Sequence, residues 1–174
     1  MRPLLAATVL TFLLAACATL PRQDRDSAET GIDGMARRIT PTSADSSCVG
    51  QPRTPICAVE TLLACFFQRN ADLCAVATPA DARQSPAIHF AQSGTAVDYV
   101  VTGVHPVQEQ DIAPDLKTAD WIKVGDVEVI VVEWTCPASN DTCLGGPSDV
   151  FSYYARPSGT TWFLTSWSAW GGPD

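Results

Sequence analysis

Positive charge is scarce in this chain. Its 174 residues include 11 Lys and Arg against 19 Asp and Glu, which gives a formal net charge of −8. Proteins that bind nucleic acid need clustered Lys and Arg to neutralise phosphates, and the same residues attract proteins to anionic lipid. The composition therefore excludes nucleic acid as an expected partner. An acidic surface suits solubility or a basic partner.

The sequence motifs of several enzyme classes are also absent. The chain has no GxSxG nucleophile motif, no HExxH zinc motif and no glycine-rich phosphate loop. Its two histidines, His89 and His105, lack a ligand-like spacing, and no CxxC pair occurs. We therefore expect no metal and no cofactor, and a structural role for both histidines.

One stretch is strongly apolar, but it is too short to span a bilayer. It runs from Leu4 to Ala16 after the positive charge of Arg2, whereas a membrane-spanning helix needs roughly 20 apolar residues. A charged start, a short apolar middle and small residues at the end are typical of a secretory signal that is removed. The alternative is a buried N-terminal helix, but no polar face repeats through the run.

The end of this stretch carries a more specific motif. The residues from Leu14 to Cys17 read LAAC, which resembles the lipobox of bacterial lipoproteins. The resemblance implies that residues 1–16 are a signal peptide and that Cys17 is lipidated, because two or three acyl chains anchor a protein stably. The protein would then be anchored in the cell envelope and face the periplasm. Ala18 after the cysteine favours the outer membrane over the inner one.

Lipidation of Cys17 would leave six of the seven cysteines free to form disulfides. Six cysteines in an exported chain predict three disulfides rather than a metal site, because the compartment is oxidising and no metal-ligand spacing is present. The sequence alone allows fifteen pairings. We favour a bond that closes a loop between two strands, together with two bonds near the predicted helices: Cys136–Cys143, Cys48–Cys57 and Cys65–Cys74.

The remaining chain divides into a tether and a domain. Residues 17–47 are poor in apolar residues and show no sustained periodicity, so we expect a flexible tether. Residues 48–174 are expected to form a single domain, because no internal repeat is present and no second domain fits.

Two helices are predicted at the start of the domain. Thr54 and Pro55 form a helix start, with an N-cap followed by proline at the first position. A second, short helix is expected over Ala71–Ala77, before Thr78 and a proline. The first helix carries apolar residues at steps of three and four, which predicts a buried stripe: Ile56, Val59, Leu63, Phe66 and Phe67.

Strand character begins after Pro86, where β-branched and aromatic residues become frequent. One of the predicted strands, Val127–Trp134, is apolar on both faces and should be central. The full set of expected strands is Ala87–Gln92, Thr95–Val104, Val127–Trp134, Val150–Arg156 and Thr161–Ala169.

Helices followed by four to six strands predict an α+β fold with a curled, mostly antiparallel sheet. A helix packed on such a sheet is similar to the NTF2-like or cystatin-like fold, and the similarity of element order covers residues 48–174. The resemblance implies a cone-shaped cavity between helix and sheet, which relatives use for catalysis, ligand binding or assembly.

Carboxylates within predicted strands are the candidate catalytic groups, namely Asp98, with its neighbour Tyr99, and Glu133. A buried carboxylate has a raised pKa and can act as a general base, as in ketosteroid isomerase, an enzyme with the NTF2-like fold. The simpler alternative places both carboxylates on the solvated face of the sheet. Glu133 shares a side of its strand with three valines: Val127, Val129 and Val131.

The last predicted strand contains Trp162, Trp167 and Trp170. Strand alternation would point Trp162 and Trp170 to one face, and Trp167 together with Phe163 to the other. One set would fill the core, and the other would be partly exposed or line a binding surface, because Trp is common in ligand and partner sites.

These features predict a lipid-anchored envelope protein that acts by binding or in assembly, with a protein or a small apolar ligand as its partner. Two alternatives stay open. One is a small enzyme that uses Asp98 or Glu133 in a pocket. The other is an acidic inhibitor of a basic cell-wall hydrolase, with residues 109–111 as the acidic loop.

Overall fold

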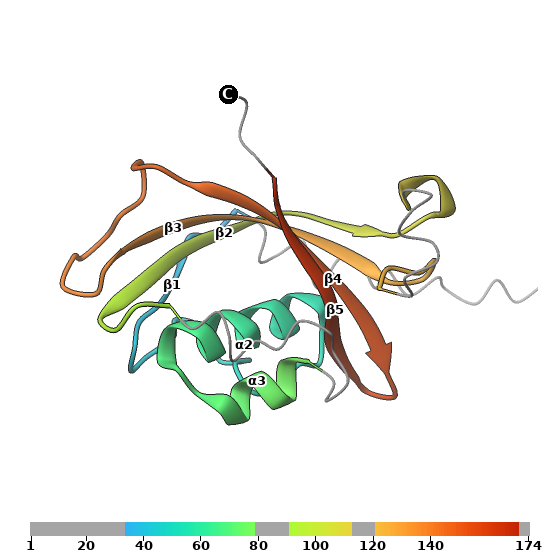
Figure 1. Ribbon diagram of the computed structural model, residues 1–174, viewed down its shortest axis with the longest axis horizontal. Coiled ribbons are helices and arrows are strands. Elements are labelled where there is room, and N and C mark those ends of the chain that lie inside the picture. Colours follow the sequence, from blue (N-terminus) through green and yellow to red (C-terminus); the bar gives the residue numbers. More distant parts are fainter. Residues whose placement is uncertain (1–33, 79–90, 113–120, 171–174) are drawn as a thin grey trace, which may run out of the picture.

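A computed structural model describes residues 34–78, 91–112 and 121–170 of the chain. Figure 1 shows one twisted sheet with both helices packed against the same face. All five strands are antiparallel to their neighbours and follow the spatial order β1-β2-β3-β4-β5. The elements are β1 (Arg37–Ile39), α2 (Pro55–Gln68), α3 (Ala71–Ala77), β2 (Thr95–Pro106), the short 3-10 helix η2 (Glu109–Asp111), β3 (Val127–Pro137), β4 (Asp149–Ser158) and β5 (Thr161–Trp170). The predicted α+β fold is confirmed.

Local capping signals set the bounds of both helices, as the sequence predicts. The Thr54 side chain accepts a hydrogen bond from the backbone N–H of Cys57, and Pro55 occupies the first turn of α2. Arg69 ends α2 in the left-handed conformation, with φ 52°. Asn70 then caps α3 by accepting from two backbone N–H groups. The predicted range of α3, Ala71–Ala77, is confirmed at both ends.

The predicted strands are confirmed with one exception. The central position of β3 is confirmed, and β2 continues two residues beyond the predicted end at Val104. The predicted strand Ala87–Gln92 falls mainly outside the described residues, and its last two residues, Ala91 and Gln92, lie in no strand. The edge of β2 that such a strand would have joined is occupied by β1.

Strand β1 lies within the segment predicted to be a flexible tether. Arg37 pairs with Tyr99 and Ile39 pairs with Val97 on β2, while the Gly34 N–H donates a hydrogen bond to the Val101 carbonyl. The tether prediction is therefore wrong for residues 34–47, which belong to the folded domain. Composition could not reveal this, because the segment contributes a single fully buried apolar side chain, Ile39.

The three predicted disulfides are all present, with Cα–Cα distances of 5.4, 5.0 and 5.9 Å. The first ties the segment before α2 to the helix, the second ties α2 to α3, and the third closes the loop between β3 and β4. They are Cys48–Cys57, Cys65–Cys74 and Cys136–Cys143.

A β-bulge in β5 changes the predicted orientation of its tryptophans. Tyr154 of β4 pairs with Ser166, whereas the next residue, Ala155, pairs with Leu164, so one extra residue is present in β5. An extra residue reverses the alternation of side chains beyond it. Trp162 and Trp167 consequently both pack against the core between sheet and helices. The prediction that they point to opposite faces is wrong. The Trp170 side chain lies outside the described part of the structure.

The buried position of Ile39 gives a direct test of where the domain begins. We expect Ile39→Ala to lower the free energy of unfolding by about 2–5 kcal/mol, because it leaves a cavity beneath β1. The matched control is Met35→Ala, since Met35 is 65% exposed and its change should stay within about 0.5 kcal/mol. Urea unfolding measures both. Equal stability of the two variants would mean that residues 34–47 do not belong to the domain.

Candidate functional site

Four carboxylates are buried within the described part of the chain: Glu60, Asp98, Asp126 and Glu133. Burial disfavours a charged carboxylate unless a cation or several hydrogen bonds compensate it. The partners of each carboxylate therefore indicate whether it has a structural role. Three of the four are paired with an arginine.

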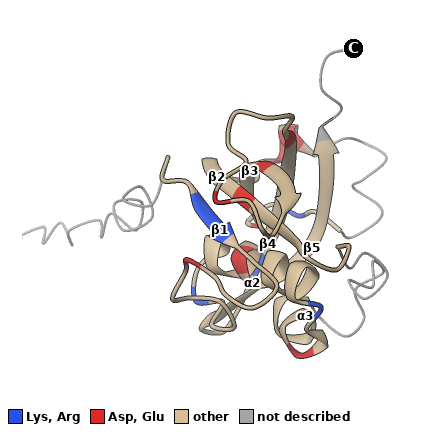
Figure 2. Cartoon of the chain, turned by 90° about the vertical axis from the view of Figure 1, so that its left-hand side faces the viewer, with Lys and Arg blue, Asp and Glu red and all other residues tan. Residues whose placement is uncertain are grey.

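Glu60 joins helix α2 to the first two strands. It accepts a hydrogen bond from Arg37 Nη1 of β1 at 2.5 Å and from the Tyr99 hydroxyl of β2 at 2.8 Å, and it also accepts from the Ser46 hydroxyl. Figure 2 shows the basic segment of β1 beside α2. Burial raises the pKa of Tyr99, and the neighbouring Glu60 charge adds to the rise. This group therefore has a structural role.

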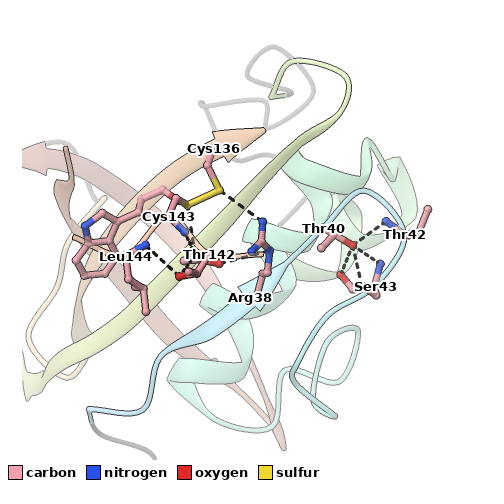
Figure 3. A network of polar contacts seen from close by, with 10 residues as sticks. Arg38, Thr40, Thr42, Ser43, Cys136, Thr142, Cys143 and Leu144 are labelled. Carbon is pink, nitrogen blue, oxygen red and sulfur yellow. Dashed lines mark hydrogen bonds and ion pairs between the residues drawn. A yellow bond between two sulfur atoms is a disulfide. The ribbon is translucent and has the colours of Figure 1, made fainter. Parts of the chain in front are cut away.

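Asp98 lies on the opposite face of the sheet, away from the helices, because its neighbours Val97 and Tyr99 face the core. It pairs with Arg38 Nε at 3.5 Å and accepts a hydrogen bond from the backbone N–H of Cys143 at 2.7 Å. Figure 3 shows Arg38 reaching the disulfide loop, where its Nη2 lies 3.5 Å from the sulfur of Cys136. Asp98 thus holds this loop against the sheet.

Asp126 forms a two-pronged ion pair just before β3. Its two carboxylate oxygens accept from Arg156 Nε at 2.7 Å and from Arg156 Nη2 at 2.8 Å. One oxygen also accepts the backbone N–H of Lys123 at 2.8 Å. The pair fixes the turn before β3 to strand β4.

Glu133 is the exception among the buried carboxylates. It lies on β3, on the face toward the helices, opposite Tyr99 of β2 and Asp149 of β4. The Tyr153 hydroxyl donates a hydrogen bond to Glu133 Oε1 at 2.5 Å. None of the Lys, Arg or His side chains that the structure describes contacts this carboxylate. Only 7% of Glu133 is exposed.

The surroundings of Glu133 change its acidity. Burial raises the pKa of Glu133 from 4.5 to about 7; the Tyr153 hydrogen bond opposes this rise and the nearby Asp149 charge adds to it. Burial also raises the pKa of Tyr153, and the Glu133 charge contributes. Near neutral pH this carboxyl group can therefore accept or release a proton, or accept a cation as a partner.

Aromatic rings continue from Glu133 across the concave face. Phe151 lies beside Tyr153 with ring centroids 6.0 Å apart, and Trp167 of β5 is the register partner of Tyr153. Phe66 of α2 meets Trp167 edge-on, with ring centroids 6.1 Å apart. Phe66, Phe151 and Trp167 all keep part of their surface exposed. We define the Glu133 site as Glu133, Tyr153, Phe151, Trp167 and Phe66.

The structure separates the three predicted catalytic candidates. Tyr99 and Glu133 lie opposite each other on the inner face, but the Tyr99 hydroxyl binds Glu60 instead. Asp98 is on the other face, because adjacent residues of a strand point in opposite directions. The alternative that placed both carboxylates on a solvated face is also wrong, since Asp98 and Glu133 are buried.

Sequence reasoning missed Glu60 and Tyr153, although a signal for each was present. Glu60 follows Ile56 by four residues, so it belongs to the same apolar stripe as Val59 and Leu63. Tyr153 alternates with Phe151 in its strand, which places both on one face.

The other sequence candidates contribute little chemistry. His105 is exposed at the end of β2, and His89 lies outside the described residues. Residues 109–111 form the exposed 3-10 helix η2. Two groups of two cysteines and one carboxylate come close enough to suggest a metal, but their sulfurs are bonded to each other in disulfides.

Comparison with protein-family models, with curated proteins and with solved structures found no match to this chain. Within the described residues, no helix combines the length and the apolar character needed to cross a membrane.

The raised pKa of Glu133 predicts a pH-dependent stability. The folded protein retains a proton that the unfolded chain releases between pH 4.5 and about 7, so stability falls as the pH rises through this range, by up to roughly 3 kcal/mol. Glu133→Gln keeps an acceptor for Tyr153 and removes the titration. We expect this variant to match the wild type at pH 4 and to exceed its stability at pH 8.

Urea unfolding at both pH values measures this difference. The control is Asp141→Asn, which removes a negative charge from an exposed position in the β3–β4 loop. The same pH dependence in the wild type and in Glu133→Gln would show that Glu133 does not titrate in this way.

Proposed function

We propose that this protein is a lipid-anchored module of the bacterial cell envelope that binds a ligand at the Glu133 site. The anchoring part rests on the LAAC motif that ends at Cys17. The binding part rests on one observation: Glu133 is buried without a cationic partner among the described residues, whereas the other three buried carboxylates each have an arginine.

A buried carboxylate without a cation disfavours folding, and an apolar residue at the same position would avoid this penalty. Such unfavourable groups concentrate at functional sites, where the protein accepts lower stability for binding or chemistry. The partly exposed rings of Phe66, Phe151 and Trp167 provide apolar contact area that continues from Tyr153, the hydrogen-bond partner of the carboxyl group. A few polar groups among aromatic side chains are typical of ligand sites.

The scaffold around the site supports a binding role. The Cys65–Cys74 disulfide joins α2 to α3 directly beside Phe66, so it limits the movement of this wall of the site. Tyr153 is 2% exposed and its ring is held in the core. A site whose side chains are held in place binds with a smaller entropic penalty.

A proton-transfer enzyme is the second candidate function. The observation that favours it is the 2.5 Å hydrogen bond between Tyr153 and a carboxyl group whose pKa is raised to about 7. A general base works best when its pKa lies near the working pH. This candidate also agrees with the resemblance of element order to the NTF2-like fold. Asp98 would have no part in it, because it lies on the other face.

Native mass spectrometry of the full-length protein, purified gently from its own membranes, tests the proposal. We expect a chain that starts at an acylated Cys17, contains three disulfides and carries a bound small molecule. Trp167→Leu should lose the bound molecule, because the ring forms one wall of the site. Leu144→Ala should retain it, because Leu144 is 44% exposed in the β3–β4 loop.

Three results would contradict the proposal separately. A purified chain that still begins at Met1 would contradict the proposed lipid anchor at Cys17. A processed chain without a bound molecule would contradict binding at the Glu133 site. So would a bound molecule that is equally abundant in Trp167→Leu and Leu144→Ala.

A further inference from the structure

In the part of the chain that the structure describes, each buried carboxylate other than Glu133 has a guanidinium group beside it. Arg37 serves Glu60, Arg38 serves Asp98 and Arg156 serves Asp126. The fold therefore compensates these three buried negative charges with arginine side chains of its own. None of the described Lys, Arg or His side chains pairs with Glu133. Its hydrogen-bond partner Tyr153 lies beside the partly exposed ring of Phe151 and pairs in register with Trp167.

We propose that the ligand of the Glu133 site is an organic cation of the alkylammonium class. Its charged nitrogen pairs with the Glu133 carboxylate, and its carbon chain lies against Phe66, Phe151 and Trp167. This inference rests on the proposed binding function and names the chemistry of the ligand.

The charges that face Glu133 favour a cation over an anion. Strand β4 contributes the exposed Asp149 opposite Glu133 and the Tyr153 hydroxyl, while β2 contributes Tyr99. Helix α2 contributes Glu60, whose charge is already paired with Arg37. Among the described residues, the groups that face the carboxylate are thus Asp149, two phenols and the Glu60–Arg37 ion pair. An anionic ligand would meet the uncompensated negative charges of Glu133 and Asp149.

The aromatic rings favour an organic cation over a metal ion. The faces of aromatic rings carry negative charge density and attract ammonium groups, most strongly in the case of Trp. A hard divalent cation takes six or more oxygen ligands, and Mg²⁺ keeps several of them as water. The described residues offer Glu133 and Asp149 as carboxylates at this position, and the neighbouring Tyr153 and Phe151 present aromatic rings rather than further oxygen ligands of this kind. The hydrocarbon chain of an alkylammonium also fits the apolar surface of the three rings.

Binding of two probes of equal size tests the inference on the full-length protein in detergent at pH 8. The probes are n-butylammonium and the neutral 1-butanol, each titrated calorimetrically at the same total chloride concentration. We expect butylammonium to bind at least tenfold more tightly than 1-butanol. Glu133→Gln should abolish this preference, and Leu144→Ala should leave it unchanged. Trp167→Leu should weaken the binding of both probes.

Three outcomes overturn the inference without removing the proposed function. Equal affinity for the two probes, with retained sensitivity to Trp167→Leu, would show a site that binds ligands but does not select a cation. Binding of neither probe, or equal binding of butylammonium by the wild type and Glu133→Gln, would also overturn it. The bound molecule seen by native mass spectrometry decides the proposed function independently.

An ammonium group can belong to a free amine or to a lipid headgroup. Phosphatidylethanolamine added to the detergent micelles distinguishes these sources, with phosphatidylglycerol as the matched control. Displacement of butylammonium by the first lipid alone would assign the headgroup as the source. If neither lipid diminishes the binding of butylammonium, the natural ligand would be assigned as a free amine. Both results uphold a cationic ligand.

Discussion

The fully buried carboxylate of Glu60 must have a cationic partner, and the arrangement of the N-terminal half of the domain depends on how it obtains one. Its partner, Arg37, comes from a segment that is polar and remote along the chain. Their pairing, with Tyr99 as a further donor, joins helix α2 to strands β1 and β2. Removal of one partner from such a group typically destabilises a protein by about 3–5 kcal/mol, because the other charge stays buried. The short strand β1 is therefore an essential part of the sheet.

The need of a buried carboxylate for a compensating cation also explains contacts elsewhere in the molecule, and it distinguishes Glu133 from the other buried carboxylates. Asp98 and Asp126 each use an arginine to attach a loop or turn to the sheet. Glu133 has only the hydroxyl of Tyr153 among the described residues, although it lies on the sheet face that packs against the helices, as the Glu60 partner Tyr99 does. The other buried carboxylates of the described residues are neutralised by arginines of the same chain. Glu133 is the exception, so it is the position where a proton or a cation from outside the chain would compensate the charge.

Much of the fold could be predicted because its signals are local. The Thr54 cap and the proline after it define the start of α2. Of the fifteen possible cysteine pairings, the favoured one joins cysteines in neighbouring elements, and it is the one present. The central strand β3 is predicted from apolar residues on both faces. The sequence predicts the candidate site only in part, because it indicates Glu133 but not Tyr153. It also groups Asp98 with Glu133, although Asp98 lies on the outer face of the sheet and Glu133 on the face toward the helices. The bulge before Ser166 places Trp167 on the same face as Trp162, against the prediction, because an inserted residue leaves no mark in the sequence pattern.

The sequence by itself determined the elements with local causes, namely both helices and four of the five strands, together with the acidic charge. It allowed fifteen disulfide pairings, and the structure contains the favoured one. The tertiary structure alone decided which buried carboxylates are neutralised and that residues 34–47 belong to the domain. It also decided that Phe66 meets Trp167, and that Phe151 lies beside Tyr153, the hydrogen-bond partner of Glu133. The physical reason is distance along the chain. Caps, turns and helix periodicity act over three or four residues, whereas the free energy of a buried charge depends on groups that arrive from β1, α2, β4 and β5 when the sheet closes over the helices.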